Sequence, residues 1–250
     1  MTAQTRDDDF LGGRLTLRQP ARGYRSGADA VMLAAACDAR PGDRVLELGC
    51  GAGVALLCLG ARVPGLVLTG IERQAGLADL ARHNADATGI AARIITGDLT
   101  DPPEVLRAES FDHVIANPPF FADGTPAPDE SRAASRHEDS PLEAWIDMAL
   151  RRLATGGWLT LIHRPEALDR ILAALSGRAG GVAILPVSAR AGRPAGRIIV
   201  AARKGARSPL RLLSPFILHA KQSHEADGED LTAAAQAVLR GAAGINLKLS

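Results

Sequence analysis

The sequence has few aromatic residues, few cysteines and no long hydrophobic run. Its 250 residues include five phenylalanines, two tryptophans, one tyrosine and three cysteines. So few aromatics argue against an extended surface on which many bases stack, and three cysteines cannot form a disulfide framework. Apolar runs such as Ala30–Cys37 are far shorter than the roughly 20 residues that cross a membrane. We therefore expect a globular protein that does not contact a membrane.

Targeting and metal-binding signals are also missing. No basic stretch followed by an apolar run opens the chain, so no secretory signal is predicted. The six histidines show no metal-ligand spacing, and no Cys-x-x-Cys pair occurs. We predict a cytoplasmic protein without a metal, and the sequence leaves its oligomeric state open.

The net charge of +1 conceals an uneven distribution along the chain. Residues 1–150 hold 14 basic and 22 acidic residues, residues 151–221 hold 13 and 2, and residues 222–250 hold 2 and 4. A basic segment of this kind favours either a face that meets a polyanion or a solvated surface rich in arginine. Arg190, Arg193 and Arg197 are the candidates for gripping an RNA backbone.

Apolar strands and helices alternate after Pro41, which predicts an α/β sheet that is mostly parallel. The predicted strands are 44–48, 66–72, 92–96, 111–116, 158–162, 182–186 and 197–202. The predicted helices are 27–37, 54–62, 75–88, 142–153, 168–175 and 231–239. The last two strands have no helix between them, so we expect an antiparallel pair at one edge. A short hairpin is predicted over Phe10–Gln19, after nine polar residues that we expect to be frayed.

A glycine-rich loop follows the first strand of this series. Glu47 is followed by Gly49, Gly51 and Gly53 at alternate positions. Glycines let a ligand approach main-chain N–H groups at the start of a helix. The spacing does not match the dinucleotide pattern G-x-G-x-x-G, so the alternatives are a different nucleotide-like cofactor or a tight turn with no ligand. Glu72 ends the next strand, where an acid accepts hydrogen bonds from ribose hydroxyls in doubly wound sheets.

The most specific feature is Asn117-Pro118-Pro119-Phe120, at the end of the fourth strand. The two prolines stiffen the corner and fix where its carbonyl groups point. The Asn117 side-chain oxygen and the Pro118 carbonyl can each accept one hydrogen of an exocyclic amine, which frees the nitrogen lone pair for methylation. Phe120 offers a face on which a base stacks, worth roughly 1–3 kcal/mol. A base within a folded nucleic acid must be extruded to reach this corner.

These residues resemble the class I methyltransferases that modify exocyclic amines through an (Asn/Asp/Ser)-Pro-Pro-(Tyr/Phe) motif. Within that group, the chain is most similar to the bacterial tRNA1(Val) adenine-37 N6-methyltransferase family. Arg25–Leu33 resembles the segment of that family which lies near the methionine end of the cofactor, and the stretch 224–239 resembles its C-terminal end loosely. Phe120 stands where the best-known members carry Tyr.

The resemblance implies a Rossmann-like, doubly wound, seven-stranded sheet and S-adenosylmethionine as the cofactor. It implies one methyltransferase domain over 1–250, with an N-terminal part at 10–40, a core at 41–205 and a C-terminal extension at 206–250. The implied catalytic residues are Asn117, Pro118, Pro119 and Phe120. The implied cofactor-binding residues are Asp29, Glu47, Gly49, Gly51, Gly53, Glu72, Asp98, Leu99 and Asn117. Asp98 resembles the acid that receives the adenine amino group, with Leu99 packing on that ring.

The expected reaction is N-methylation of an exocyclic amine, first of adenine N6 in tRNA, so the expected partner is RNA. Two related enzymes stay open: a guanine-N2 rRNA methyltransferase and a glutamine-N5 protein methyltransferase. A non-catalytic module that binds S-adenosylmethionine is the alternative of another class.

Further candidates are weaker. The loop 121–140 carries Phe121, and His137 with Arg132 and Arg136, as candidate substrate contacts. We interpret Cys50 as a small residue in the glycine loop, since methyl transfer to an amine needs no covalent intermediate.

Overall fold

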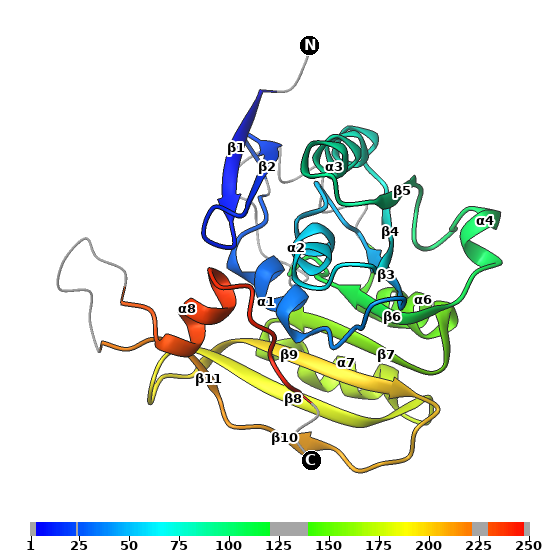
Figure 1. The fold of residues 1–250 in the computed structure, drawn as a ribbon. Helices are drawn as coiled ribbons and strands as arrows, with labels where there is room; N and C mark the ends of the chain where they lie inside the picture. Colours follow the sequence, from blue (N-terminus) through cyan, green and yellow to red (C-terminus); the bar gives the residue numbers. More distant parts are fainter. Residues whose placement is uncertain (1–3, 24, 121–139, 222–229, 248–250) are drawn as a thin grey trace.

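The computed structural model describes residues 4–23, 25–120, 140–221 and 230–247. Its centre is a sheet with helices on both faces (Figure 1). Five adjacent strands of this sheet run parallel to one another: β3 (Arg44–Leu48), β4 (Val67–Glu72), β5 (Ala92–Thr96), β6 (Phe111–Ala116) and β7 (Leu153–His163). Because these strands are parallel, their carboxyl ends meet at one edge of the sheet, which we call the site edge.

The remaining strands extend the sheet beyond β7. They are β8 (Ala179–Arg190), β9 (Ala195–Lys204), β10 (Arg211–Leu212) and β11 (Phe216–His219). Over the described residues the order is β10-β8-β9-β7-β6-β3-β4-β5, and β11 also pairs with β8. Strand β9 is antiparallel to both β7 and β8. The predicted mostly parallel sheet with an antiparallel pair is therefore confirmed.

The described sheet has nine strands instead of the predicted seven. The two additions, β10 and β11, contain two and four residues. Segments this short have too few positions to reveal an alternating pattern in the sequence. The pair formed by β8 and β9 also runs well beyond the predicted ranges at both ends.

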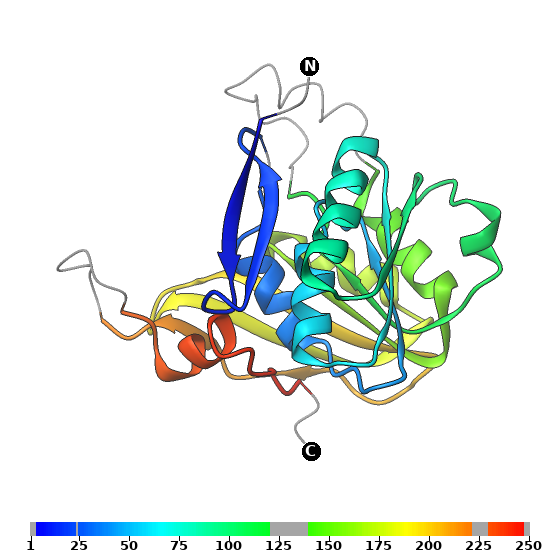
Figure 2. The same ribbon diagram turned by 45° about the horizontal axis from the view of Figure 1, so that its top comes forward.

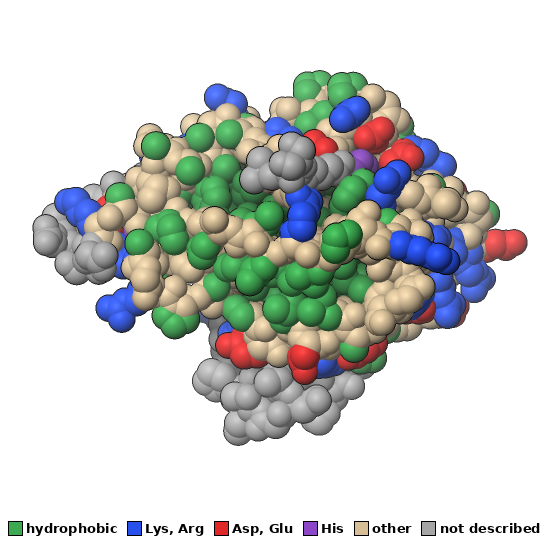
Figure 3. Space-filling view, turned by 90° about the horizontal axis from the view of Figure 1, so that it is seen from below, with side chains coloured by type: hydrophobic (Ala, Val, Ile, Leu, Met, Phe, Trp, Pro, Cys, Tyr) green, Lys and Arg blue, Asp and Glu red, His purple; other side chains and the backbone are tan. Residues whose placement is uncertain are grey.

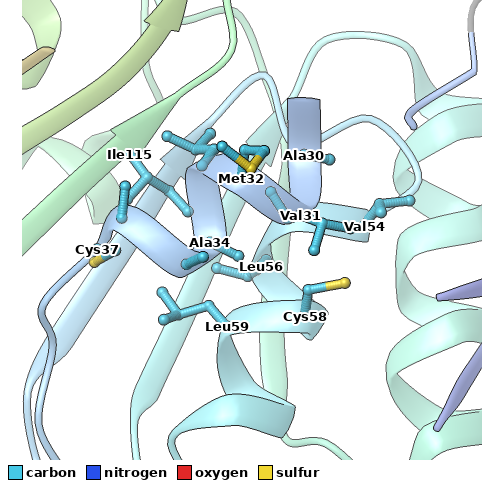
Figure 4. Packing of buried hydrophobic residues seen from close by; sticks show 14 of the residues in the cluster. Ala30, Val31, Met32, Ala34, Cys37, Val54, Leu56, Cys58, Leu59 and Ile115 are labelled. Atoms are coloured by element: carbon cyan, nitrogen blue, oxygen red, sulfur yellow. The ribbon is translucent and has the colours of Figure 1, made fainter. Parts of the chain in front are cut away.

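Helices cover both faces of the sheet, and each face buries its own hydrophobic cluster. One face carries α1 (Ala28–Ala36), α2 (Val54–Arg62), α3 (Ala75–Thr88) and α8 (Ala233–Leu239). The other carries α4 (Glu104–Arg107), α6 (Leu142–Arg152) and α7 (Leu168–Leu175), the last preceded by the short turn η1 (Pro165–Ala167). Figure 4 shows side chains of α1, α2 and β6 packed together in the first cluster.

The sequence explains these elements locally. Strand β6 sends Val114 and Ala116 to one cluster and Ile115 to the other, so it is buried on both faces. Helix α3 ends at Thr88 and is capped by Gly89, which takes the left-handed φ of 68° that a helix C-terminus favours. The predicted boundaries of α2 and α3 are both confirmed.

The expectation of a frayed N-terminus is wrong for the described residues. Strand β1 (Thr5–Phe10) pairs antiparallel with β2 (Leu15–Pro20). Cross-strand hydrogen bonds hold the acidic residues: Thr16 Oγ1 donates to Asp9 at 2.7 Å, and Gln19 Nε2 donates to Asp8 at 2.9 Å. The prediction was wrong because the partners of these acidic side chains lie on the next strand, and the run of acids by itself does not reveal them.

Asn84 of α3 holds this hairpin against the core. Its side chain accepts a hydrogen bond from the Arg18 N–H at 2.8 Å and donates to the Arg18 carbonyl at 2.9 Å. It also donates to the Ala52 carbonyl, in the glycine loop, at 2.9 Å. Figure 2 shows the hairpin standing beside α1 and α3. One buried amide thus connects the hairpin, α3 and the glycine loop.

The C-terminal part is fastened by a charged cluster. Arg190 Nη1 lies 2.9 Å from Asp230 Oδ2, and His219 Nδ1 lies 2.7 Å from Asp230 Oδ1. The hydrogen bond from Arg190, more than that from His219, lowers the pKa of Asp230 to about 2. The Arg190 side chain is therefore engaged within the fold. Of the stretch 224–239, residues 224–229 lie outside the described part.

Apolar side chains reach the surface at the outer edge of the sheet. Leu212 of β10 is 70% exposed, and Leu210 is also exposed. Figure 3, which views the molecule from the β10 side, shows apolar side chains gathered over the middle of this face. No helix among the described residues is long and apolar enough to cross a membrane.

Candidate active site

The site edge brings together the predicted motifs. Leu48 at the end of β3 faces Ile71 of β4 and Ala116 of β6. Glu72 at the end of β4 faces Thr96 at the end of β5. The glycine loop, Glu72, Asp98 and the Asn-Pro-Pro-Phe corner, which are distant in sequence, therefore follow neighbouring strands at one edge.

The three glycines of the loop adopt backbone conformations that other residues avoid. Their φ values are 61° at Gly49, 55° at Gly51 and 85° at Gly53. A Cβ at Gly49 would come within 2.4 Å of the Trp145 ring, whereas one at Gly51 would meet no atom within 4 Å. Gly49 is therefore needed for packing against α6, and Gly51 borders open space at the site edge.

Glu72 fastens the loop to the sheet. Its Oε2 accepts a hydrogen bond from the Gly51 N–H at 2.9 Å, and its Oε1 accepts one from the Gln74 N–H at 2.8 Å. The side chain is buried. These hydrogen bonds hold the backbone of the glycine loop next to the end of β4, where the sequence predicts that the ribose binds.

Glu47 lies beneath the loop and points toward α2. It is 3% exposed, and its Oε2 accepts a hydrogen bond from the Leu56 N–H at 2.9 Å. Burial raises the pKa of Glu47 well above its ordinary value, against the opposing effect of the Leu56 hydrogen bond. The direct contact of Glu47 with the cofactor stays a prediction. The observed role of Glu47 is to hold the start of α2 through the Leu56 hydrogen bond.

Glu47→Gln is expected to stabilise the protein at neutral pH. A raised pKa in the folded state means that stability is lost as the pH rises from the unfolded value, about 4.3, toward the folded value. Glutamine keeps an acceptor for the Leu56 N–H and carries no charge. At pH 8 we expect Tm to rise by about 2–4 °C for each kcal/mol added to the free energy of unfolding. This rise in Tm should become smaller as the pH is lowered toward 4. The exposed Glu104→Gln serves as control in thermal unfolding at both pH values, and a gain that is the same at both would contradict this.

Cys50 fills a small space behind the loop. A Cβ at Gly70 of β4 would come within 2.7 Å of its sulfur, so the thiol packs directly on the strand. Burial, followed by the charges of Glu47 and Glu72, raises the pKa of the Cys50 thiol well above its ordinary value. A thiol that stays protonated is a poor nucleophile, which supports its interpretation as a small packing residue.

Asp98 and Leu99 follow β5 on the far side of Glu72. Asp98 Oδ1 accepts hydrogen bonds from the Thr100 N–H and hydroxyl, both at 2.7 Å. These bonds, the hydroxyl first, lower the pKa of Asp98, so the carboxylate is charged at neutral pH. Leu99 is half-buried against the cluster that contains α4 and α6.

The Asn-Pro-Pro-Phe corner begins directly after β6, with Pro118 buried. The ring of Phe120 has three neighbours from distant parts of the chain. His163 meets it edge to face at 5.0 Å between centroids, and the guanidinium groups of Arg197 and Arg164 lie 4.6 and 5.9 Å from its centre. The ring is thus fixed by the ends of β7 and β9.

His163 was not predicted as a site residue. It ends β7 at the site edge, is 7% exposed, and its Nδ1 has no hydrogen-bond partner among the described residues. Burial lowers the pKa of His163, with an opposing effect of the main-chain groups of Arg164 and Pro119. The imidazole is therefore neutral at pH 7. Its position at a strand end is the signal that was available in the sequence.

Two other residues of the site were missed for a similar reason. Asn84 continues the buried face of α3 formed by Ala78 and Ala81, where a polar residue signals a specific hydrogen-bond partner. Trp145 belongs to the buried face of α6, but its contact with Gly49 follows only from the fold. Both support the glycine loop.

Asp29 of α1 lies near this corner but is already engaged. Its Oδ2 is 2.8 Å from Arg197 Nε. Its predicted contact with the cofactor stays a prediction, as does the RNA contact of the exposed Arg193. Phe121, Arg132, Arg136 and His137 lie outside the described residues. The described part contains no group of three or more His, Cys, Asp or Glu arranged to hold a metal ion.

Comparisons with known proteins agree with this geometry. The family described as methyltransferase small domain matches residues 27–178. A tRNA1(Val) (adenine(37)-N6)-methyltransferase of Porphyromonas gingivalis is 34% identical over 170 residues, which cover 64% of this chain and 67% of that protein. A protein of the same name from Dickeya chrysanthemi is 28% identical over 193 residues, which cover 75% of this chain and 76% of that one.

Solved structures show the same fold. The crystal structure of a predicted O-methyltransferase, protein Atu636 of Agrobacterium tumefaciens, superimposes with a TM-score of 0.72 and 29% identity, covering 88% of this chain and 100% of that one. A methyltransferase from Pyrococcus furiosus shares the fold at a TM-score of 0.58 and 16% identity, covering 77% and 90%.

The matched range begins just before α1 and ends beyond α7, so it contains the glycine loop and the Asn-Pro-Pro-Phe corner. The prediction of a methyltransferase, made from those two motifs, is confirmed. The chain belongs to the methyltransferase small domain family.

Proposed function

We propose that this protein methylates the N6 amine of adenine in tRNA, with S-adenosylmethionine as the methyl donor. The observation that carries the proposal is the Asn117–Phe120 corner at the end of β6, one strand from the glycine loop. Relatives named as tRNA adenine-N6 methyltransferases, from Porphyromonas gingivalis and Dickeya chrysanthemi, support the same substrate.

The residues at the site edge fit S-adenosylmethionine. Open space beside Gly51 admits a ligand to the loop backbone, which a Cβ there would obstruct. Glu72 lies where the ribose hydroxyls are expected, and Asp98 with Leu99 lies where the adenine is expected. When bound, the cofactor supplies a methyl group on a positively charged sulfur, which makes a good leaving group.

The chain's own residues prepare the amine for transfer. The Asn117 side-chain oxygen and the Pro118 carbonyl each accept one amino hydrogen, so the nitrogen leaves the plane of the ring and its lone pair is exposed. The two prolines fix where the Pro118 carbonyl points before substrate arrives, and preorganised dipoles of this kind lower a barrier. Phe120 stacks the base, and no strongly basic side chain is needed.

The alternatives differ in the hydrogens they offer to this pair of acceptors. A hydroxyl has one hydrogen, so an O-methyltransferase, which the Agrobacterium tumefaciens protein is predicted to be, would leave one acceptor unmatched. Guanine N2 and the glutamine amide each offer two, so their exclusion needs product analysis. A module that binds the cofactor without catalysis has no use for two aligned acceptors.

The deciding experiment compares a strain lacking the gene with its parent, by mass spectrometry of the nucleosides of tRNA and rRNA and of digested protein. Loss of N6-methyladenosine, restored when the purified protein and labelled S-adenosylmethionine are added to that tRNA, supports the proposal. Unchanged N6-methyladenosine with loss of N2-methylguanosine or of methylglutamine would refute it.

The proposal extends to organisation and location. We infer that the chain acts as one methyltransferase domain, in which α8 and the N-terminal hairpin support the core through Val238, Phe10 and Leu17. We also infer a cytoplasmic location, because the three cysteines are free and buried and tRNA is modified in that compartment.

A further inference from the structure

The site edge is divided by charge, and the Asn-Pro-Pro-Phe corner lies at the division. The acids Glu72 and Asp98 follow β4 and β5, on one side of β6. Arg164 follows β7, and Arg197 lies near the start of β9, on the other side. A cationic cofactor suits the acidic half, so the basic half is left for an anionic partner.

Arg197 is the best-held cation of the basic half. Its Nε lies 2.8 Å from Asp29 Oδ2, and its Nη1 donates to the Gly196 carbonyl at 2.8 Å. Its guanidinium lies 4.6 Å from the centre of the Phe120 ring. Its Nη2 donates no hydrogen bond to any of the described residues. The guanidinium is therefore held through Nε and Nη1, while Nη2 is available to a ligand.

The surroundings of Phe120 carry an excess of positive charge. Arg164 and Arg197 both lie over the ring, His163 is neutral, and Asp29 supplies one carboxylate. A planar guanidinium pairs with phosphate through parallel hydrogen bonds and stacks on aromatic faces at the same time. A nucleotide whose base stacks on Phe120 brings its own phosphate into this neighbourhood.

We propose that Arg197, held by Asp29, is a positioning residue that binds a backbone phosphate of the target nucleotide and fixes the Phe120 ring. The proposal rests on the proposed function, because it takes RNA as the substrate. The same role is not proposed for Arg190, because its guanidinium is bound to Asp230. Asp29 then acts through Arg197 by keeping the guanidinium on the ring.

The test measures KM for tRNA, kcat, cofactor affinity and the salt dependence of tRNA binding in matched variants, with undermodified tRNA from the deletion strain. Arg197→Gln is expected to raise KM about 10-fold, as for one lost charge-assisted hydrogen bond, and to reduce the salt slope by about 0.7–0.9. Cofactor affinity is expected to stay within about twofold. Arg197→Lys keeps the charge, so its salt slope should equal that of the wild type. Its KM should lie between those of the wild type and Arg197→Gln, because an ammonium group cannot stack on the ring and pair with phosphate through two parallel hydrogen bonds.

Two controls make the result specific. Arg203→Gln removes an exposed arginine from the same strand at the opposite edge, where it donates to the Gly156 carbonyl, and should leave all four quantities unchanged. Asp29→Asn should raise KM less than Arg197→Gln, and the double variant should resemble Arg197→Gln alone, since both changes act on one unit.

Three outcomes overturn the inference: an unchanged KM and salt slope in Arg197→Gln, an equal effect of Arg203→Gln, or a loss confined to cofactor affinity. Thermal unfolding of each variant identifies misfolding, in which case Arg197→Lys carries the test. If the wild-type protein transfers no methyl group to any RNA, the proposed function fails instead. A wild-type protein that methylates tRNA, with Arg197→Gln equally active, removes only the role of Arg197.

Discussion

Asn117→Ala is expected to lower kcat about 10²–10³-fold, the usual effect of removing one preorganised polar group from a transition state. Asn117 follows β6 at the site edge, and the proposed function makes its side-chain oxygen one of two acceptors for the amine. Without it, the nitrogen lone pair stays conjugated with the ring. Cofactor affinity should fall far less than kcat, because Asn117 is only one of the expected cofactor contacts and the loop and Glu72 are untouched. Single-turnover methylation of tRNA and calorimetric titration of the cofactor measure the two quantities separately.

The matched control for this prediction is Asn117→Asp. A carboxylate keeps an acceptor oxygen at the same position, and Asp is among the residues that the motif allows. Its kcat should therefore lie well above that of Asn117→Ala. Equal losses in both variants, or full activity in Asn117→Ala, would show that the side-chain oxygen does not hold the amine.

The parts of the site edge that could be predicted from sequence have strong local signals. The glycine loop directly follows an apolar strand and precedes an apolar helix. Gly49–Gly53 therefore indicates both the end of the strand and the start of the helix. The two prolines after Ala116 end β6 unambiguously, since proline cannot continue a central strand. In each case a few adjacent residues carry the signal, and the structure adds only their relative position.

The parts that could not be predicted depend on contacts between distant segments. Asp29 and Arg197 are 168 residues apart in sequence, and only the pairing of β9 beside β7 brings Arg197 to the corner, where His163 faces Ile198. The antiparallel pairing of β1 with β2 makes a strand of residues that look like a solvated tail. Periodicity within one segment contains no information on these partners.

The last prediction separates two glycines that have the same backbone conformation but different surroundings. At Gly49 a methyl group would meet the Trp145 ring at 2.4 Å. Overpacking costs about 1–3 kcal/mol and a left-handed φ about 1–2 kcal/mol more. Gly49→Ala is therefore expected to lower Tm by about 4–20 °C, at 2–4 °C for each kcal/mol. Gly51→Ala should lower Tm by only about 2–8 °C, because its methyl group enters open space.

Cofactor binding should reverse this order. The methyl group of Gly51→Ala lies in the space that the loop leaves for a ligand, so affinity for S-adenosylmethionine should fall at least about 10-fold, a loss of about 1.4 kcal/mol. Gly42→Ala, in the turn before β3, has a similar left-handed φ of 93° and an equally open Cβ position, and it controls for strain alone. Adding Trp145→Phe to Gly49→Ala should recover part of the lost Tm, since a smaller ring relieves the contact. Equal loss of affinity in Gly42→Ala and Gly51→Ala would mean that the open space beside the loop is not where the cofactor binds.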